Sequence, residues 1–195
     1  ADLSFGPVIE DVKRGYIYEE LDGIRFRIGP NSFFQSNSAV ALQMYRAIRD
    51  NVKGNVLDLY SGVGSISLFI SSAVENVTGV EMVEAAVEDA KVNMESNGIE
   101  NVKFLCDDAG AYLAEHESEF QTVVMDPPRA GLHPKVVKRI LQAAPERIVY
   151  MSCNPLTFAE DARIFNEQYN LDWVKAYDMF PQTPHIEMIG VFNRK

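Results

Sequence analysis

From Asn55 onward, apolar runs alternate with helix-like stretches, and this alternation limits the possible folds more than any other feature. Strand-like runs are expected at 55–60, 76–81, 101–106, 121–126, 146–151 and near 187–193. Helices are expected near 64–73, 82–97, 108–116, 134–144 and 156–169. Such alternation builds a mainly parallel sheet with helices on both faces. The sequence therefore predicts an α/β fold of the doubly wound, Rossmann-like kind.

The residues before position 55 follow a different pattern. "GYIYEE" and "IRFRI" flank a short turn that contains Gly23, which predicts a β-hairpin. Apolar residues at 40, 44, 45 and 48 lie on one face of a helix over 38–50. We expect two parts: a linker or hairpin segment over 1–36, left from a preceding region, and a main domain over 37–195.

Composition narrows the class of protein. The 195 residues suffice for one domain with a full core. No apolar run approaches the ~18 residues that span a bilayer, and no leader is visible, so we expect no membrane association. Two cysteines are too few for a disulfide framework or a cysteine-ligated metal, which favours a cytoplasmic setting and no metal site. The net charge of −10 argues against a broad nucleic-acid contact surface on this piece alone.

Ligands of parallel sheets bind outside the carboxyl ends of the strands, so the residues after each strand are the informative ones. "DLYSGVGS" follows the first strand, and Gly62 and Gly64 allow a tight turn against a ligand. Ser67 replaces the third glycine of the dinucleotide fingerprint, which weakens that interpretation and leaves a plain structural turn open. Glu81 ends the next strand, where it could accept ribose hydroxyls or simply begin a helix.

The third and fourth strands also end in polar residues. Cys106 lies on an apolar strand and is expected to pack in the interior. Of Asp107 and Asp108, one could hold an adenine amino group while the other caps the next helix. Asp126 precedes two prolines, which make a rigid loop that positions either chemistry or a flat ring, or else a plain spacer.

The fifth strand ends in "MSCNP", and its cysteine belongs to the same edge of the sheet. Cys153 is either a packed thiol or a nucleophile, and the start of the following helix is expected to favour its thiolate. Further on, His185 and Glu187 alternate with apolar residues, so their side chains are expected on one side of an extended segment. Either is a candidate general base.

Taken together, these motifs resemble those of the S-adenosylmethionine-dependent RNA uracil-5 methyltransferases, which modify tRNA or large-subunit rRNA. The matching segments, in the order found in that family, are "FFQSN" (33–37), "DLYSGVGS" (58–65), "GVE" (79–81), "DPPRAGL" (126–132), "SCNP" (152–155) and "HIE" (185–187). The resemblance implies a class I methyltransferase fold with a seven-stranded sheet, and 37–195 as the catalytic domain.

The same resemblance implies roles for individual residues. Cys153 would be the nucleophile that adds to C6 of uracil, and Glu187 the base that removes the C5 proton. S-adenosyl-L-methionine would be the cofactor and S-adenosyl-L-homocysteine its product, with no metal. The residues expected to bind the cofactor are Gln35, Tyr60, Gly62, Ser65, Glu81, Asp108 and Asp126. Phe33, Phe34 and Arg129 are candidates to meet the uracil ring or a phosphate.

The chain also departs from the family. Some relatives carry Asn where Ser65 stands, so this assignment is the least supported of the cofactor set. Full-length members generally carry an N-terminal RNA-binding barrel, and some carry a cysteine-ligated iron–sulfur cluster. We expect neither in this chain, because the residues before the hairpin are too few for the barrel and two cysteines are too few for the cluster. We expect a monomer that acts on tRNA or rRNA and whose RNA-binding domain is missing from this chain.

Three other interpretations stay open. A cytosine-5 RNA methyltransferase would place its cysteine in the slot that holds Asp126 here. An N-methyltransferase would use the Asp-Pro-Pro loop but follow it with an aromatic residue, whereas Arg129 stands there. A cofactor-fold module that binds RNA or a partner with little activity would need neither Cys153 nor Glu187.

Overall fold

The computed structural model describes residues 15–30, 32–116 and 119–195. The first fourteen residues of the expected linker therefore lie outside the described part. The described strands are β1 Ile17–Leu21, β2 Ile24–Ile28, β3 Asn55–Leu59, β4 Asn76–Glu81, β5 Val102–Cys106, β6 Thr122–Met125, β7 Arg147–Ser152, β8 Tyr169–Tyr177 and β9 Glu187–Arg194. The helices are α1 Ser38–Arg49, α2 Ser65–Ile70, α3 Glu84–Ser96, α4 Ala109–Glu115, α5 Pro134–Ala143 and α6 Pro155–Phe165, with a 3₁₀ turn at Ser71–Ala73.

Seven strands form the central sheet in the order β5-β4-β3-β6-β7-β9-β8. The first five run parallel, and β9 is antiparallel to both of its neighbours. The strands β3, β6 and β7 are buried along nearly their whole length, which is why they read as continuous apolar runs. The predicted seven-stranded, mainly parallel sheet is confirmed.

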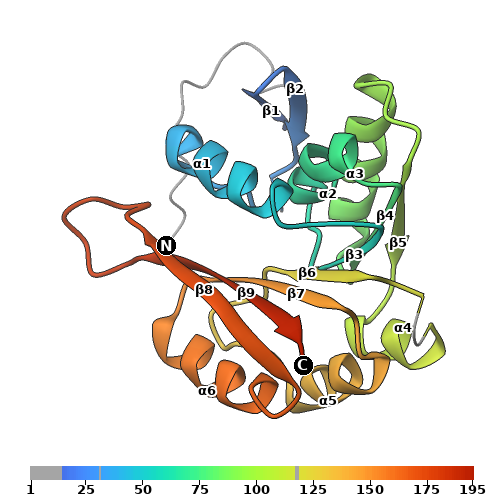
Figure 1. Ribbon diagram of the computed structural model, residues 1–195. Coiled ribbons are helices and arrows are strands. Elements are labelled where there is room, and N and C mark those ends of the chain that lie inside the picture. Colours follow the sequence, from blue (N-terminus) through green and yellow to red (C-terminus); the bar gives the residue numbers. More distant parts are fainter. Residues whose placement is uncertain (1–14, 31, 117–118) are drawn as a thin grey trace.

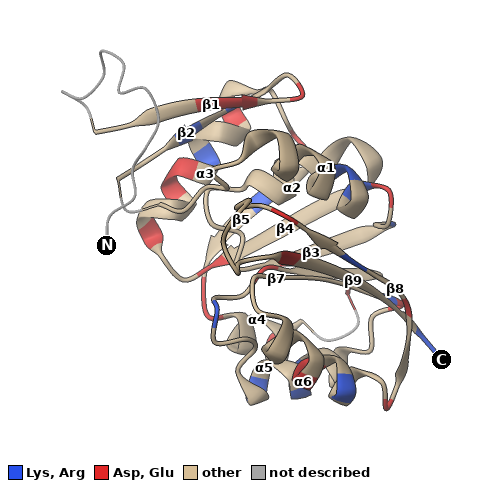
Figure 2. Ribbon diagram, turned by 90° about the vertical axis from the view of Figure 1, so that its left-hand side faces the viewer, with Lys and Arg blue, Asp and Glu red and all other residues tan. Residues whose placement is uncertain are grey.

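Two helical layers cover this sheet (Figures 1 and 2). The layer that holds α1, α2, α3 and the β1–β2 hairpin packs on one face, and α4, α5 and α6 pack on the other. Each layer has its own apolar cluster, the first around Phe26, Tyr45 and Ile70 and the second around Leu57 and Tyr150. No helix in the described residues is long and apolar enough to cross a membrane.

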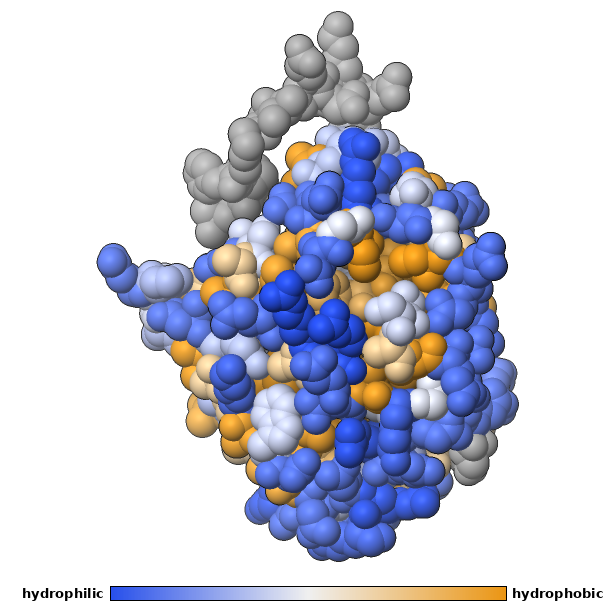
Figure 3. Space-filling model, turned by 45° about the horizontal axis from the view of Figure 1, so that its top comes forward, coloured by the Kyte–Doolittle hydropathy of each residue, from blue (hydrophilic) through white to orange (hydrophobic). Residues whose placement is uncertain are grey.

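The strand β8 has no counterpart among the strands expected from the sequence, where this segment stayed unassigned. Seven of its nine residues are exposed or only partly buried, and Leu171 and Val174 are among the exposed apolar side chains. An edge strand with so little buried surface lacks the apolar pattern that identifies the inner strands. Figure 3 shows that apolar residues lie exposed between hydrophilic ones on another face of the molecule as well.

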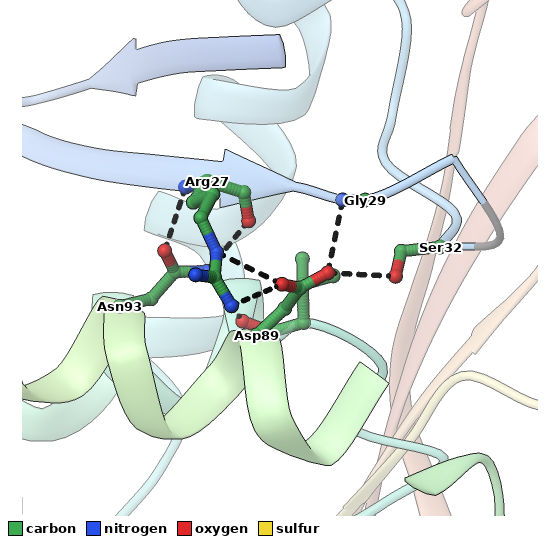
Figure 4. A network of polar contacts seen from close by, with 6 residues as sticks. Arg27, Gly29, Ser32, Asp89 and Asn93 are labelled. Carbon is green, nitrogen blue, oxygen red and sulfur yellow. Dashed lines mark hydrogen bonds and ion pairs between the residues drawn. The ribbon is translucent and has the colours of Figure 1, made fainter. Parts of the chain in front are cut away.

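The hairpin is fastened to α3 by a polar network (Figure 4). The buried Asp89 accepts hydrogen bonds from the Arg27 guanidinium at 2.6 and 2.9 Å, from the Gly29 N–H at 2.9 Å and from the Ser32 hydroxyl at 3.1 Å. Asn93, one turn on, bonds both the N–H and the carbonyl of Arg27. The hairpin thus packs into the same cluster as α1, α2 and α3, while the boundary expected at 36/37 stays a prediction.

Candidate active site

The sheet register brings the predicted site residues to one edge. Leu59 pairs with Val80 on one side and with Met125 on the other. The next residues along these strands, Tyr60, Glu81 and Asp126, are therefore neighbours. Ser152 of β7 pairs with Met188 of β9, and because these strands are antiparallel, one further step sets Cys153 beside Glu187. Figure 2 looks onto this edge of the sheet, between the two helical layers.

The glycine loop after β3 is held against Glu81. One carboxylate oxygen accepts the Gly62 N–H at 3.1 Å and the other accepts the Val83 N–H at 2.9 Å. Gly64 has a φ of 81°, and a Cβ there would come within 2.5 Å of the Phe104 ring. Both the left-handed backbone and the close packing therefore require glycine at this position.

Tyr60 begins this loop with a φ of 64°, which is uncommon for an aromatic residue. Such strained backbone concentrates at functional sites. Burial and the nearby carboxylates of Asp108 and Glu81 raise the pKa of the Tyr60 phenol to about 12. The phenol is therefore neutral and can donate a hydrogen bond in this acidic surrounding.

Asp58 belongs to this site although it was not among the predicted residues. It is fully buried on β3, and one oxygen accepts the Ser67 hydroxyl at 2.6 Å while the other has no partner. Ser67 thus occupies the third-glycine position with a buried hydrogen bond. Burial raises the pKa of Asp58 to about 7, against an ordinary value of 3.8. Its position inside a buried strand was the sequence signal, since an aspartate there needs a partner or a function.

The segment before α1 and the start of α2 hold further residues predicted for the site. Gln35 is buried, and its side-chain oxygen has no partner in the structure. Ser65, at the start of α2, accepts a hydrogen bond from the Tyr45 hydroxyl of α1 at 3.1 Å. Phe33 is exposed, whereas Phe34 is half-buried and packs on Phe26 with ring centroids 5.4 Å apart. Of the two phenylalanines, only Phe33 therefore presents a free ring.

One expectation at the end of β5 is corrected, and the helix cap expected there is found. Cys106 is exposed rather than packed, and its Sγ lies 3.6 Å from the Met82 carbonyl, because the last residue of this edge strand leaves the core. Asp108 is the residue that caps α4, with one oxygen accepting the N–H groups of Gly110 and Ala111 at 3.0 and 2.9 Å. A ligand role for Asp108 must therefore share this carboxylate with the cap.

Cys153 is half-buried in an acidic surrounding. Burial and the carboxylates of Glu187 and Asp126 raise its pKa, and the Arg129 guanidinium opposes them only in part. The expectation that the following helix favours the thiolate is therefore wrong in its net direction. Burial, followed by the two facing carboxylates, outweighs the Arg129 guanidinium, so the resting group is a thiol.

Glu187 and His185 are not equivalent candidates for a base. Glu187 begins β9, is 6% exposed, and has one oxygen without a partner. Burial raises its pKa to about 7. His185 lies outside the strand, is exposed, and its Nδ1 is 3.3 Å from the Arg129 Nη1. The pKa of Asp126 is also raised well above its ordinary value, by burial and by Glu187 and Asp58.

The loop that follows Asp126 is fastened to α6 at two points. The Asn154 side chain donates to the Arg129 carbonyl at 3.2 Å. Asp161, itself bonded by the Tyr150 hydroxyl at 2.8 Å, accepts the Leu132 N–H at 3.2 Å. The rigid loop predicted from the two prolines is thus set by side chains of the neighbouring helix, which the sequence pattern did not indicate.

The donor set of this edge fits an adenosyl amino acid such as S-adenosyl-L-methionine. Glu81 lies beside the glycine loop, where a ribose binds in folds of this kind. Buried oxygens of Gln35, Asp58 and Ser61 lack partners in the structure, and buried polar groups ordinarily have one. A polar ligand at this edge of the sheet would satisfy them.

Comparisons with known proteins show the family of this chain. The family model described as tRNA (uracil-5-)-methyltransferase matches residues 10–116 and 110–195. The tRNA (uracil(54)-C(5))-methyltransferase of Pyrococcus furiosus is 41% identical over 100% of this chain and 46% of its own length. An uncharacterized RNA methyltransferase of Mycoplasma mobile is 44% identical over 95% of this chain and 52% of its own length. The chain thus spans about half the length of the curated relatives it matches.

Solved structures give the same result. The tRNA (uracil-54, C5)-methyltransferase of Pyrococcus abyssi, solved with S-adenosyl-L-homocysteine, superposes with a TM-score of 0.82 at 41% identity, over 91% of this chain and 44% of that one. The M. jannaschii tRNA m1G37 methyltransferase has a TM-score of 0.70 at 17% identity, over 93% of this chain and 57% of that one, which shows the fold alone. The fold is that of the Rossmann-like methyltransferases, and the chain belongs to the tRNA (uracil-5-)-methyltransferase family.

Proposed function

We propose that this chain transfers a methyl group from S-adenosyl-L-methionine to C5 of a uridine in RNA, through a covalent bond to Cys153. The observation that carries the proposal is the β7–β9 register, which pairs Ser152 with Met188 and so sets the thiol beside Glu187. A thiol and a carboxylate in one cleft are the two groups that methylation of C5 of a uracil requires.

The first step is thiolate addition to the ring. The Cys153 sulfur bonds to C6, and the electron pair moves to C5 and O4 as an enolate, which makes C5 nucleophilic. S-adenosyl-L-methionine, when bound, would supply the methyl group: its S–CH3 bond would break as the bond to C5 forms, and S-adenosyl-L-homocysteine would leave. Because burial and the carboxylates raise the pKa of Cys153, the thiol must give up its proton to solvent when the substrate arrives, and Arg129 is the cation beside it that favours this loss.

The second step regenerates the enzyme. Glu187 removes the proton from the methylated C5, the C5–C6 double bond re-forms, and the bond from C6 to Cys153 breaks. A carboxylate with a pKa of about 7 is half ionised near neutral pH, so it can both take up this proton and release it. His185 is exposed and is not assigned this role.

The cofactor residues follow from the placement of the groups. Glu81 would accept the ribose hydroxyls beside Gly62, and Asp108 would reach the adenine with the oxygen that its helix cap leaves over. Gln35, Tyr60, Ser65 and Asp126 complete the proposed set, and Asp58 joins it through its unpartnered oxygen. These assignments rest on the unsatisfied polar atoms and on the loop geometry described above.

The substrate is proposed to be tRNA or rRNA, bound by a monomer in the cytoplasm. The Pyrococcus furiosus relative is named for uridine 54 of tRNA, and the relatives are about twice this chain's length. With a net charge of −10, this chain is poorly suited to hold RNA along its whole surface. A further RNA-binding domain would provide that grip.

The test is covalent trapping. RNA that contains 5-fluorouridine, incubated with the chain and S-adenosyl-L-methionine, should give a protein–RNA adduct that resists denaturation, because fluorine at C5 cannot leave as a proton does. Cys153→Ala should give none, and Cys106→Ser, which removes the other cysteine, should give as much as the parent. An equal yield from Cys153→Ala would refute the nucleophile.

A second variant separates the base from the nucleophile. Glu187→Gln should form the adduct with ordinary uridine RNA and release it slowly, since C5 keeps its proton. Release at the parent rate would place the base elsewhere. Mass mapping of the methylated nucleosides distinguishes uridine from cytidine, and methylcytidine as the product would establish the cytosine-5 alternative instead.

A further inference from the structure

We propose that Asn154 is a positioning residue that ties the turn of the nucleophile to the loop that carries Asp126 and Arg129. The inference rests on the proposed function, because it assigns Asn154 to the same cleft. Asn154 touches no reacting atom in this scheme. It acts by fixing where the Arg129 guanidinium lies relative to Cys153.

The side chain of Asn154 has two separate tasks. Its oxygen caps α6 by accepting the Leu156 N–H at 3.1 Å. Its amide nitrogen donates to the Arg129 carbonyl at 3.2 Å, across 25 residues of sequence. A cap alone needs only the oxygen, which serine or aspartate also supplies. The amide nitrogen is therefore the part that capping does not explain.

The backbone of Asn154 is fixed as well, so the side chain has a rigid base. Its N–H donates to the Ser152 hydroxyl at 3.2 Å. Its carbonyl accepts the Thr157 hydroxyl at 3.1 Å and the Phe158 N–H at 3.0 Å. The contact to Arg129 thus joins two well-held segments, the end of β7 with the start of α6 and the Asp-Pro-Pro-Arg loop.

The position of Arg129 depends on this hydrogen bond from the Asn154 amide. Its guanidinium opposes the effect of Glu187 and Asp126 on the Cys153 thiol, and its Nη1 lies 3.3 Å from Nδ1 of the exposed His185. The far end of the loop has its own anchor, the bond from the Leu132 N–H to Asp161 at 3.2 Å. Loss of the Asn154 amide should therefore release the Arg129 end and leave the Leu132 end in place.

The three charged groups that face Cys153 come from two segments. Glu187 begins β9, Asp126 follows β6, and Arg129 lies in the loop after Asp126. Of the three, only Arg129 favours the thiolate. When Arg129 moves away, the two carboxylates act unopposed, and the ionisation of the thiol shifts to higher pH.

The decisive variant is Asn154→Ser, which retains a capping oxygen but removes the donor to Arg129. The matched control is Asn166→Ser, the same change at the exposed other end of α6. All proteins carry Cys106→Ser, so that iodoacetamide reports on Cys153 alone. The readouts are the pH dependence of alkylation, the melting temperature, and kcat and KM for RNA methylation.

Asn154→Ser should melt at the parent temperature, raise the pH midpoint of alkylation by about half a unit, and lower kcat about tenfold at unchanged KM. Asn166→Ser should match the parent in all three. An alkylation midpoint in Asn154→Ser equal to that of Asn166→Ser would overturn the proposal and reduce Asn154 to a helix cap. Alkylation needs no RNA, so it tests Asn154 even if the chain methylates no uridine, an outcome that would refute the proposed function separately.

Discussion

Two buried carboxylates of this protein differ in how completely they are hydrogen-bonded. Asp89, beneath the hairpin, accepts four hydrogen bonds, two from the Arg27 guanidinium and one each from Gly29 and Ser32. Asp58, in the sheet, accepts one from Ser67 and has an oxygen without a partner. The first arrangement stabilises the fold, because a buried charge is tolerated when it is paired and fully bonded. The second leaves bonding capacity for something that enters the cleft.

The largest expected change in stability follows from the removal of the fully hydrogen-bonded carboxylate of Asp89. Asp89→Ala leaves the Arg27 guanidinium, the Gly29 N–H and the Ser32 hydroxyl without their acceptor, and should lower the free energy of unfolding by about 4 kcal/mol. The neighbouring Glu88→Ala, on the exposed face of α3, serves as the control. Urea denaturation measures both variants. A loss for Asp89→Ala no greater than that for Glu88→Ala would remove the distinction between the two regions.

Asp58→Asn should raise the free energy of unfolding, whereas Asp89→Ala lowers it. The folded-state pKa of Asp58, about 7, lies above its ordinary value of 3.8. Its favourable contribution is therefore present below the ordinary value and is lost as the pH rises through 7. At pH 8 the neutral asparagine should stabilise the fold by roughly 3 kcal/mol, and this gain should shrink at pH 5. Equal gains at both pH values would show that Asp58 is already charged or already neutral throughout.

The pH dependence of turnover tests the proposed roles of Glu187 and Cys153. Glu187 must be ionised to remove the C5 proton, and its pKa is about 7. Below that value, the decay of the covalent adduct should slow about tenfold per pH unit. The raised pKa of Cys153 should make adduct formation rise further on the alkaline side. Rapid-quench measurements separate the two steps, and an adduct decay that is constant from pH 5 to pH 7 would contradict the role of Glu187.

The smallest expected effect is Ser32→Ala. Asp89 keeps three of its four hydrogen bonds in this variant, so the loss should be about 1 kcal/mol. Ser72→Ala, at an exposed serine, is the matched control. A loss as large as that of Asp89→Ala would mean that the network acts as a single unit rather than as a sum of bonds.

The sequence predicted the inner sheet well because β3, β6 and β7 are buried on both faces and appear as apolar runs. It missed β8, whose side chains are mostly exposed. It also gave no sign that Asp89 is buried, because an aspartate on a helix with acidic neighbours at 84 and 88 resembles a solvated face. Burial by a distant hairpin is a tertiary effect that local pattern does not contain.

The sequence predicted which strand ends meet, and not how the groups there ionise. Position after a strand was enough to bring Glu81, Asp126 and Cys153 to one edge, while their roles stay predictions. The pKa of Cys153 depends on its burial and on the charges that face it, and burial together with Glu187 and Asp126 reversed the expected direction. The prediction that Cys106 is packed was wrong for a simpler reason, since the last residue of an edge strand can leave the core.

The position of β9 affects the order in which the sheet can form during synthesis. It is the last of the described strands along the chain, yet it inserts between β7 and β8. During synthesis every other strand leaves the ribosome first, and β7 must wait with one edge unpaired until β9 arrives. Until then Cys153 stands without Glu187. A growing chain therefore has the glycine loop and Glu81 early, but the two proposed reacting groups come together only when β9 is in place.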